Sequence, residues 1–174
     1  SHAPPPREPA DREQRTGPAQ RRRMRIAELV TCGTLDPDQA DRLTAAVRQG
    51  LNILVCGATG SGKSTTLSAL AAEIPATERI ITVEDTAELA IPHPHVVALE
   101  ARPASSSGRG AVSIRDLVRN ALRMRPDRLI VGEVRGPEAA DMIEALSTGH
   151  GGSLSTVHAE TAAGAIERLV RLML

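Results

Sequence analysis

The chain of 174 residues contains no phenylalanine, tyrosine or tryptophan. Its core must therefore consist of Leu, Ile, Val, Ala and Met, which suffice for an α/β domain of this size. None of its own side chains can stack an aromatic ring on adenine or on another base. Because the net charge is also zero, a helicase-like DNA motor is disfavoured, and nucleic acid is not an expected partner.

Cysteine and long apolar runs are also scarce. Cys32 and Cys56 are the two cysteines, so there is no disulfide framework, and Cys56 is expected to be a buried structural thiol. No apolar run approaches the length of a membrane span, and no signal peptide is recognisable. These features suit a reducing cytoplasm. The start at Ser1-His2 without Met leads us to expect a fragment.

Lysine is nearly absent: Lys63 is the only one, whereas the other 20 basic residues are arginines. It lies in a segment that fits the G-x-x-x-x-G-K-[ST] pattern, between an apolar strand-like run and a helix-like run. Glycines let backbone N–H groups converge on phosphate oxygens, and a helix N-terminus adds partial positive charge. We therefore predict a site for ATP and Mg²⁺ formed by Gly57, Ala58, Thr59, Gly60, Ser61, Gly62, Lys63, Ser64 and Thr65. Lys63 would reach the β- and γ-phosphates, and the Ser64 hydroxyl would ligate Mg²⁺.

Alternating strand and helix signals predict the fold class. Apolar runs predict strands at 51–56, 79–84, 96–99, 128–133 and 151–157. Capping signals predict helices that begin after Asp36, after Ser113 and at Pro137, and an apolar stripe predicts a last helix over 162–173. This order predicts an α/β fold with a parallel or mixed sheet and helices on its faces.

Several segments are predicted to lie outside this regular structure. Residues 1–25 carry seven arginines and three acids and are expected to form a disordered basic linker or tail before a domain over 26–174. Residues 101–112 are expected to form a mobile loop. Arg115, Arg119 and Arg123 share one helix face, which is either solvated or a phosphate or subunit contact. His93 and His95 are interpreted as turn residues rather than metal ligands.

Acidic and histidine side chains follow three of the predicted strands. Glu84, Glu133 and His158 each come at the end of an apolar run. Because ligands of such sheets bind beyond the carboxyl ends of the strands, these residues should meet the phosphate loop at one edge. Glu84 and Glu133 are candidates to polarise the attacking water and to hold a Mg²⁺-bound water, and His158 is a candidate sensor of the γ-phosphate. Together with Lys63 they form the predicted catalytic set.

Four motifs in this order resemble those of the secretion-superfamily traffic ATPases, with the closest likeness to the tight-adherence (Tad) or CpaF-like branch that assembles Flp pili. The Walker A box is 57–65, the aspartate box resembles 81–89, the Walker B box 125–136 and the histidine box 148–159. By this resemblance Glu133 is the Walker B glutamate, Glu84 the aspartate-box acid and His158 the histidine-box histidine. His150 matches a second family histidine, and Glu160 stands where relatives often have Asn.

The resemblance implies a P-loop NTPase with a RecA-like core sheet, and a motor that hydrolyses ATP to ADP and phosphate. Family members work as hexameric rings at the cytoplasmic face of the inner membrane, with membrane platform proteins as partners. An N-terminal domain lends them arginines. We expect the present chain to be a C-terminally incomplete motor domain that is fully active only within a full-length hexamer.

The leading expectation for the function is Flp-type pilus assembly or protein export. Two alternatives to it stay open. The alternative within the same class is a conjugation or type IV secretion ATPase that moves nucleoprotein. A nucleotide-binding assembly module without turnover is an alternative of a different class.

Overall fold

The computed structural model describes residues 24–104, 110–147, 149 and 151–174. The elements in order are α1 (Ile26–Thr31), α2 (Pro37–Arg48), β1 (Ile53–Gly57), α3 (Lys63–Ala71), β2 (Ile80–Glu84), β3 (Val96–Glu100), α4 (Ile114–Arg123), β4 (Arg128–Val131), α5 (Glu138–Ser147), β5 (Leu154–His158) and α6 (Ala162–Met173). The strands form one sheet in the order β1-β5-β4-β2-β3, and all of the pairs are parallel. The predicted α/β class is therefore confirmed. The predicted basic linker over 1–25 lies outside the described residues, apart from its last two.

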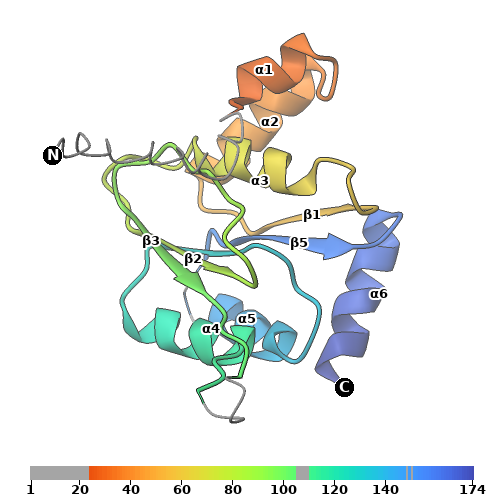
Figure 1. The fold of residues 1–174 in the computed structure, drawn as a ribbon. Helices are drawn as coiled ribbons and strands as arrows, with labels where there is room; N and C mark the ends of the chain where they lie inside the picture. The colour runs from red at the N-terminus through yellow and green to blue at the C-terminus, as the bar shows by residue number, and fades with distance from the viewer. Residues whose placement is uncertain (1–23, 105–109, 148, 150) are drawn as a thin grey trace, which may run out of the picture.

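Helices cover both faces of this sheet (Figure 1). Because successive side chains of a strand point to opposite faces, neighbouring residues of β2 enter different cores. Ile80 belongs to the cluster beneath α1, α2 and α3, whereas Ile81 and Val83 pack against α4 and α5. All five residues of β2 and all four of β4 are buried. The central strands are thus held between two aliphatic cores, as the absence of aromatic residues requires.

The predicted helix starts are built by side-chain caps. Asp36 accepts the backbone N–H of Gln39 at 2.8 Å before α2, and Ser113 accepts that of Asp116 at 3.2 Å before α4. Such caps satisfy amide groups that have no partner within the helix. The short helix α1 was not predicted, because only Ile26 and Leu29 of its six residues are buried.

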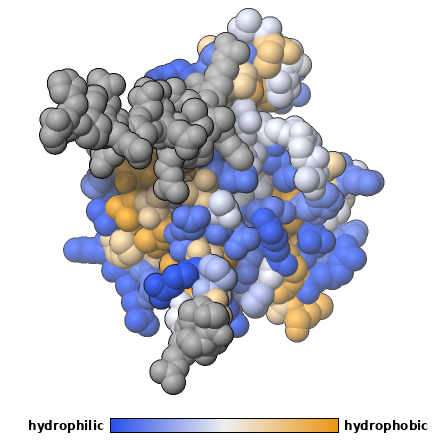
Figure 2. Space-filling view, in the orientation of Figure 1, coloured by the Kyte–Doolittle hydropathy of each residue, from blue (hydrophilic) through white to orange (hydrophobic). Residues whose placement is uncertain are grey.

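The first strand differs from the expectation, whereas the last helix, α6, has the predicted bounds. The first strand begins two residues later than predicted and lies at an edge of the sheet, so Cys56 is half-buried rather than buried. In α6, Ala165 and Leu169 are buried, but Ile166, Val170 and Met173 are exposed. Apolar surface is accordingly visible at the lower right of Figure 2, over α6. The predicted stripe is therefore only half covered.

The predicted loop over 101–112 has paired ends. The backbones of Arg102 and Val112 exchange two hydrogen bonds, of 3.0 and 2.9 Å, and form an antiparallel bridge. Residues 105–109 between them lie outside the described part. In the described residues, no helix is both long and apolar enough to cross a membrane.

Candidate functional site

The carboxyl ends of the parallel strands bring the predicted site residues to one edge of the sheet. The first strand ends at Gly57, β2 at Glu84 and β5 at His158, and Glu133 follows β4 by two residues. Gly57 lies directly opposite His158 in the register of β1 and β5. The strand ends therefore converge as the parallel sheet predicts. The catalytic roles of these residues stay predictions.

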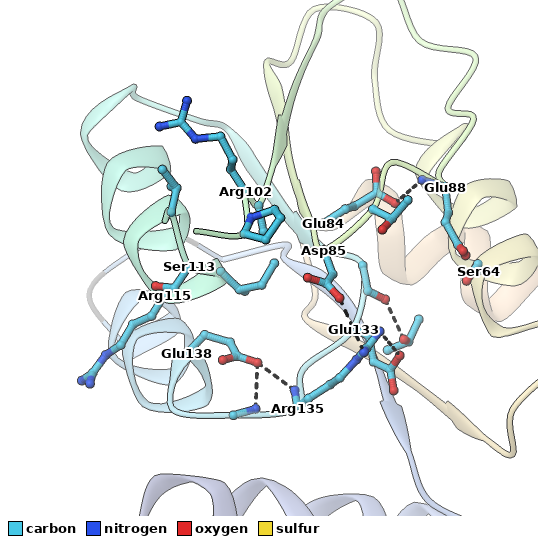
Figure 3. Close-up of a pocket in the computed structure, with 18 of the residues that line it drawn as sticks. Ser64, Glu84, Asp85, Glu88, Arg102, Ser113, Arg115, Glu133, Arg135 and Glu138 are labelled. Atoms are coloured by element: carbon cyan, nitrogen blue, oxygen red, sulfur yellow. Dashed lines mark hydrogen bonds and ion pairs between the residues drawn. The ribbon is translucent and has the colours of Figure 1, made fainter. Parts of the chain in front are cut away.

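A cavity of about 920 Å³ opens at this edge. Lys63, Ser64, Glu84 and Glu133 line it together with Thr59 and Gly60 of the phosphate loop, and Figure 3 shows the acids facing the start of α3. The far wall comes from the segment around Arg102, from the start of α4 and from the β4–α5 connection. His158 reaches the same sheet edge but is not among the lining residues. His150 lies outside the described residues.

The loop before α3 has the geometry of a phosphate cradle. Gly60 and Gly62 have φ angles of +76° and +89°, in the left-handed region that favours glycine. A Cβ at Gly57 would meet the Ser61 Oγ, so a larger residue there would force the Ser61 side chain to move. Gly62 gives no side-chain cap to α3, which leaves the first amides of that helix for an external acceptor. These features fit a phosphate group.

The Lys63 side chain folds back over this loop. Its Nζ donates to the Ala58 carbonyl oxygen at 2.8 Å. A carbonyl is a neutral acceptor, so a phosphate oxygen would compete for the ammonium group with a stronger, charge-assisted hydrogen bond. The lysine is therefore held beside the cradle and remains able to turn toward an anion.

Glu84 is a buried acid with a second duty in the fold. Its side chain is 5% exposed, and Oε1 accepts the backbone N–H groups of Glu88 and Leu89, both at 2.9 Å. Burial raises the pKa of this carboxyl, although the two backbone hydrogen bonds oppose that shift. Glu84 therefore closes the turn after β2 while it lines the cavity.

Glu133 is half-buried and lies beside a cation from its own segment. Arg135 places one guanidinium nitrogen 3.1 Å from Oε2 of Glu133 and another 3.7 Å from Oδ2 of Asp85 (Figure 3). The arginine thus spans from the end of β4 to the end of β2. This contact was not predicted from the sequence, although the i, i+2 spacing of Glu133 and Arg135 places both on one side of extended backbone.

Glu138 is a second residue of the site that was not predicted from the sequence. It is 6% exposed, and its Oε1 accepts the backbone N–H groups of Arg135 and Gly136 at 2.7 and 2.8 Å. The signal that could have indicated Glu138 is its position as an acid in the first turn of a helix, directly after Pro137. Its carboxylate fixes the connection that carries Arg135.

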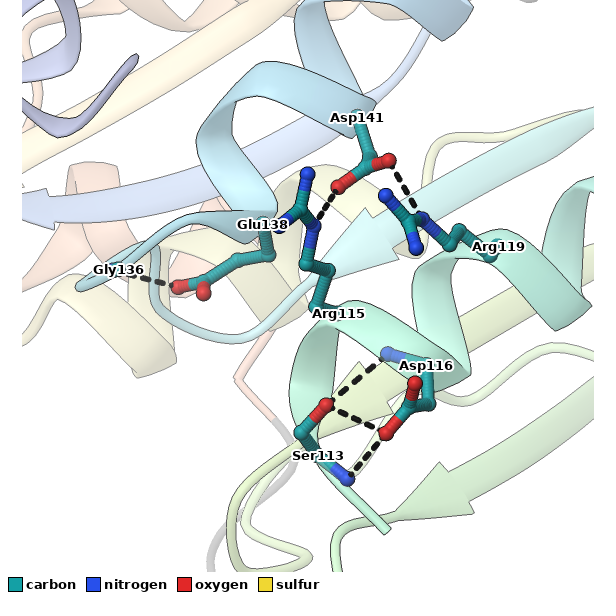
Figure 4. A network of polar contacts seen from close by, with 7 residues as sticks. All are labelled: Ser113, Arg115, Asp116, Arg119, Gly136, Glu138 and Asp141. Carbon is teal, nitrogen blue, oxygen red and sulfur yellow. Dashed lines mark hydrogen bonds and ion pairs between the residues drawn. The ribbon is translucent and has the colours of Figure 1, made fainter. Parts of the chain in front are cut away.

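The arginine face of α4 makes two ion pairs within the fold, which the sequence did not indicate. Arg115 Nε donates to Asp141 at 2.5 Å and Arg119 Nε at 2.7 Å, so one carboxylate of α5 holds both arginines (Figure 4). Burial raises the pKa of Asp141, but the hydrogen bonds from Arg119 and Arg115 outweigh it and lower that pKa. Arg115 and Arg119 stay 40% and 52% exposed, and Arg123 is exposed too, so the face is largely solvated while two of its arginines are tied to α5. The alternative of a phosphate or subunit contact stays a prediction.

The histidines before β3 lie in irregular backbone, where both make hydrogen bonds. His93 Nε2 lies 3.1 Å from the Pro75 carbonyl oxygen, and its Nδ1 accepts the backbone N–H of His95 at 3.1 Å. His95 Nε2 in turn lies 3.3 Å from a guanidinium nitrogen of Arg79. Within the described ranges, no group of three or more His, Cys, Asp or Glu side chains is arranged to hold a metal ion.

Residues 18–174 match the protein family described as Type II/IV secretion system protein. A putative conjugal transfer protein of Mycobacterium tuberculosis is 52% identical over 134 residues, which are 77% of this chain and 38% of that protein. The type IV secretion system protein VirB11 of Bartonella quintana is 46% identical over 133 residues, 75% of this chain and 36% of that protein. The chain thus spans well under half of the length of these relatives.

Solved structures share the fold. The VirB11 ATPase of the Brucella suis type IV secretion system, in complex with sulphate, has a TM-score of 0.69 and 40% identity over 85% of this chain and 40% of that one. The pilus retraction motor PilT with bound ADP has a TM-score of 0.62 and 33% identity over 89% of this chain and 42% of that one. The α/β fold of P-loop NTPases, a five-stranded parallel sheet flanked by helices, is therefore confirmed.

Proposed function

Because the chain belongs to the Type II/IV secretion system protein family, we propose that it is the ATP-hydrolysing motor part of a conjugation or type IV secretion ATPase. Family membership implies nucleotide binding and ATP hydrolysis. The domain proposed for this activity is residues 26–174. Because the chain spans only 38% of the mycobacterial relative, the activity of the whole protein is part of the proposal.

One observation carries the chemical part of this proposal. A phosphate cradle and two carboxylates, Glu84 and Glu133, line the same cavity with Lys63 and Ser64. Phosphoryl transfer to water needs a cradle for the phosphates, a carboxylate to orient or deprotonate the water, and positive charge near the transferred group. The cavity has all three kinds of group.

The residues take the following proposed roles. Residues 57–65 hold the triphosphate, with the Lys63 ammonium on its terminal phosphates. Ser64 would hold Mg²⁺, with Glu84 or Glu133 binding through water, and this ion would neutralise phosphate charge. Glu133 orients and deprotonates the attacking water. His158, at the same edge but off the cavity lining, is proposed to respond to the γ-phosphate.

The named relatives support the cellular role. Proteins similar to this chain are named for conjugal transfer and for type IV secretion, so we place conjugation or type IV secretion before Flp pilus assembly. Assembly into a hexameric ring at the cytoplasmic face of the inner membrane, with platform proteins of the membrane, belongs to the same proposal. The Tad or CpaF-like branch remains a second candidate, on the basis of the four ordered motifs alone.

The test compares wild type with Lys63→Ala and Glu133→Gln in the full-length protein. We expect Lys63→Ala to abolish ATP binding, measured with a fluorescent nucleotide analogue. Glu133→Gln should retain binding and lose turnover by 100-fold or more, measured as phosphate release. Unchanged turnover in Lys63→Ala would refute the site. If wild type and Glu133→Gln bind ATP and are equally inert, the chain is an assembly module rather than a motor.

A further inference from the structure

Arg135 lies between two carboxylates that follow different strands. Its guanidinium group contacts Glu133 at 3.1 Å and Asp85 at 3.7 Å, and these acids follow β4 and β2 respectively. The arginine and Asp85 are more than half exposed, and the Glu133 side chain is 31% exposed. Exposed ion pairs contribute little to folding stability. The arrangement therefore needs an explanation other than stability.

The backbone around Glu133 is fixed on both sides. The Thr156 hydroxyl donates to the Gly132 carbonyl oxygen at 2.6 Å, and the Val134 N–H donates to the Thr156 carbonyl oxygen at 2.8 Å. The Val134 side chain is fully buried. Consequently the remaining freedom at this position is in the Glu133 side chain, and Arg135 contacts its carboxylate.

Arg135 is itself attached to a rigid support. Glu138, 6% exposed, accepts the N–H groups of Arg135 and Gly136 through a single oxygen, Oε1. A Cβ at Gly136 would lie 3.0 Å from Oε2 of Glu138, so a larger residue there would require the carboxylate to shift by a few tenths of an ångström. Figure 4 shows the hydrogen bond from the Gly136 N–H to Glu138 at the start of α5. A buried acid thus anchors the residue whose side chain reaches Glu133.

The other cations of the cavity wall have different contacts. Arg115 is bound to Asp141 of α5, and the Arg102 Nε donates to the Gly110 carbonyl oxygen at 2.8 Å. Lys63 donates to the loop carbonyl of Ala58. Among the described cationic residues of this wall, Arg135 is the one for which an ion pair with Glu133 is seen.

We propose that Arg135 is a positioning residue for the ATPase reaction. It holds the Glu133 carboxylate at the cavity mouth and offsets the negative charge of Glu133 and Asp85, which would otherwise repel an approaching triphosphate. This inference rests on the proposed nucleotide site. It assigns the function of Arg135 to its action through the two acids, not to direct contact with the nucleotide.

A double-mutant cycle on nucleotide affinity tests this. The dissociation constant of a fluorescent ATP analogue with Mg²⁺ is measured for Arg135→Ala in the wild-type background and in a Glu133→Gln, Asp85→Asn background. We expect at least a fivefold weakening in wild type and less than twofold in the neutralised background. Arg135→Lys should recover part of the affinity, because an ammonium group offsets charge but cannot span both acids.

Arg102→Ala is the matched control, since it removes one positive charge from the same cavity without removing a carboxylate contact. Its effect should be the same in both backgrounds. Equal losses for Arg135→Ala in the two backgrounds, or no loss at all, would overturn the proposal. If the wild-type chain fails to bind the analogue, the proposed function itself fails. Melting temperatures of all variants show whether a loss comes from unfolding.

Turnover gives a second readout in the full-length protein. Arg135→Ala should lower kcat by tenfold or more, because Glu133 is no longer oriented, and should raise KM for ATP. A role confined to folding would instead lower the melting temperature and leave kcat per folded molecule unchanged. That last result would also overturn the proposal.

Discussion

Gly57 and His158 are register partners on the parallel strands β1 and β5, where the phosphate loop leaves the sheet. Neighbouring strands lie about 4.8 Å apart, so the backbone of this histidine directly flanks the first glycine of the loop. The His158 side chain is exposed and does not line the cavity. It is therefore close to the phosphate cradle without forming its wall.

This position leads to a prediction for His158→Ala. Nucleotide affinity should stay within about twofold of wild type, because no contact of the cavity wall is lost. Turnover in the full-length protein should fall by about tenfold or more if the histidine acts only when the γ-phosphate is present. His95→Ala is the matched control, because it changes another exposed histidine. His95 directly precedes β3, the outermost strand on the side of the sheet away from β1. A large loss of affinity in His158→Ala would contradict this placement.

The features that the sequence predicted correctly depend on local patterns. The strand at Glu84, the caps at Asp36 and Ser113 and the glycine loop at 57–65 follow from apolar runs, capping residues and φ preferences over a few positions. Convergence at one edge follows because parallel strands all end there. These rules need no knowledge of which strands are neighbours.

The contacts that were missed depend on the order of the strands. Arg135 reaches Asp85 because β4 lies beside β2, and no local pattern encodes that neighbour relationship. Likewise, Asp141 binds Arg115 and Arg119 across the α4–α5 contact, between residues 22 and 26 positions apart. Charge pairs at such separations become visible only when the helices are packed.

Among the described glycines near the amino ends of the strands, away from the phosphate loop, Gly152 is predicted to cost the most stability when it is replaced by alanine. A Cβ there would lie 1.9 Å from a guanidinium nitrogen of Arg128, and the φ angle is +81°. Arg128 is buried and paired with Glu78, so it cannot move without exposing or breaking that ion pair. Gly152→Ala should lower the free energy of unfolding by about 3 kcal/mol or more, measured by urea denaturation.

Gly149→Ala separates the two causes of that loss. Gly149 has a φ angle of +101° and no atom within 4 Å of its Cβ position. Its substitution should therefore cost only the backbone strain, about 1–2 kcal/mol. Equal losses at both glycines would show that Arg128 adapts to a Cβ at Gly152.

Asp141 should give the stability a specific dependence on acidic pH. Its folded-state pKa is lowered by Arg119 and Arg115, so its stabilisation is complete above the ordinary Asp pKa and is lost as the pH falls through the folded value. At pH 7, Asp141→Asn should reduce the free energy of unfolding by about 1 kcal/mol, because both arginines are substantially exposed. Near pH 2 the variant and wild type should differ little. A difference that is constant from pH 7 to pH 2 would show that charge is not the cause.

Glu84 should show the opposite sign. Burial raises its folded-state pKa, so its contribution to stability is greatest below the ordinary Glu pKa and is lost as the pH rises through the folded value. Glu84→Gln keeps an oxygen for the N–H groups of Glu88 and Leu89 and removes the buried charge. We therefore expect it to melt at a higher temperature than wild type at pH 8 in the presence of EDTA, with the two curves converging near pH 4.

Glu84→Ala is the control for the hydrogen bonds alone. It leaves two backbone N–H groups without their acceptor and should be less stable than Glu84→Gln by about 1–3 kcal/mol at every pH, because neither variant carries the titrating carboxyl. If Glu84→Gln is instead less stable than wild type at pH 8, the ionised carboxylate stabilises the fold. If it is more stable but loses turnover in the full-length protein, then the fold tolerates a buried charge at a cost in stability, which is the pattern expected of an acid retained for chemistry.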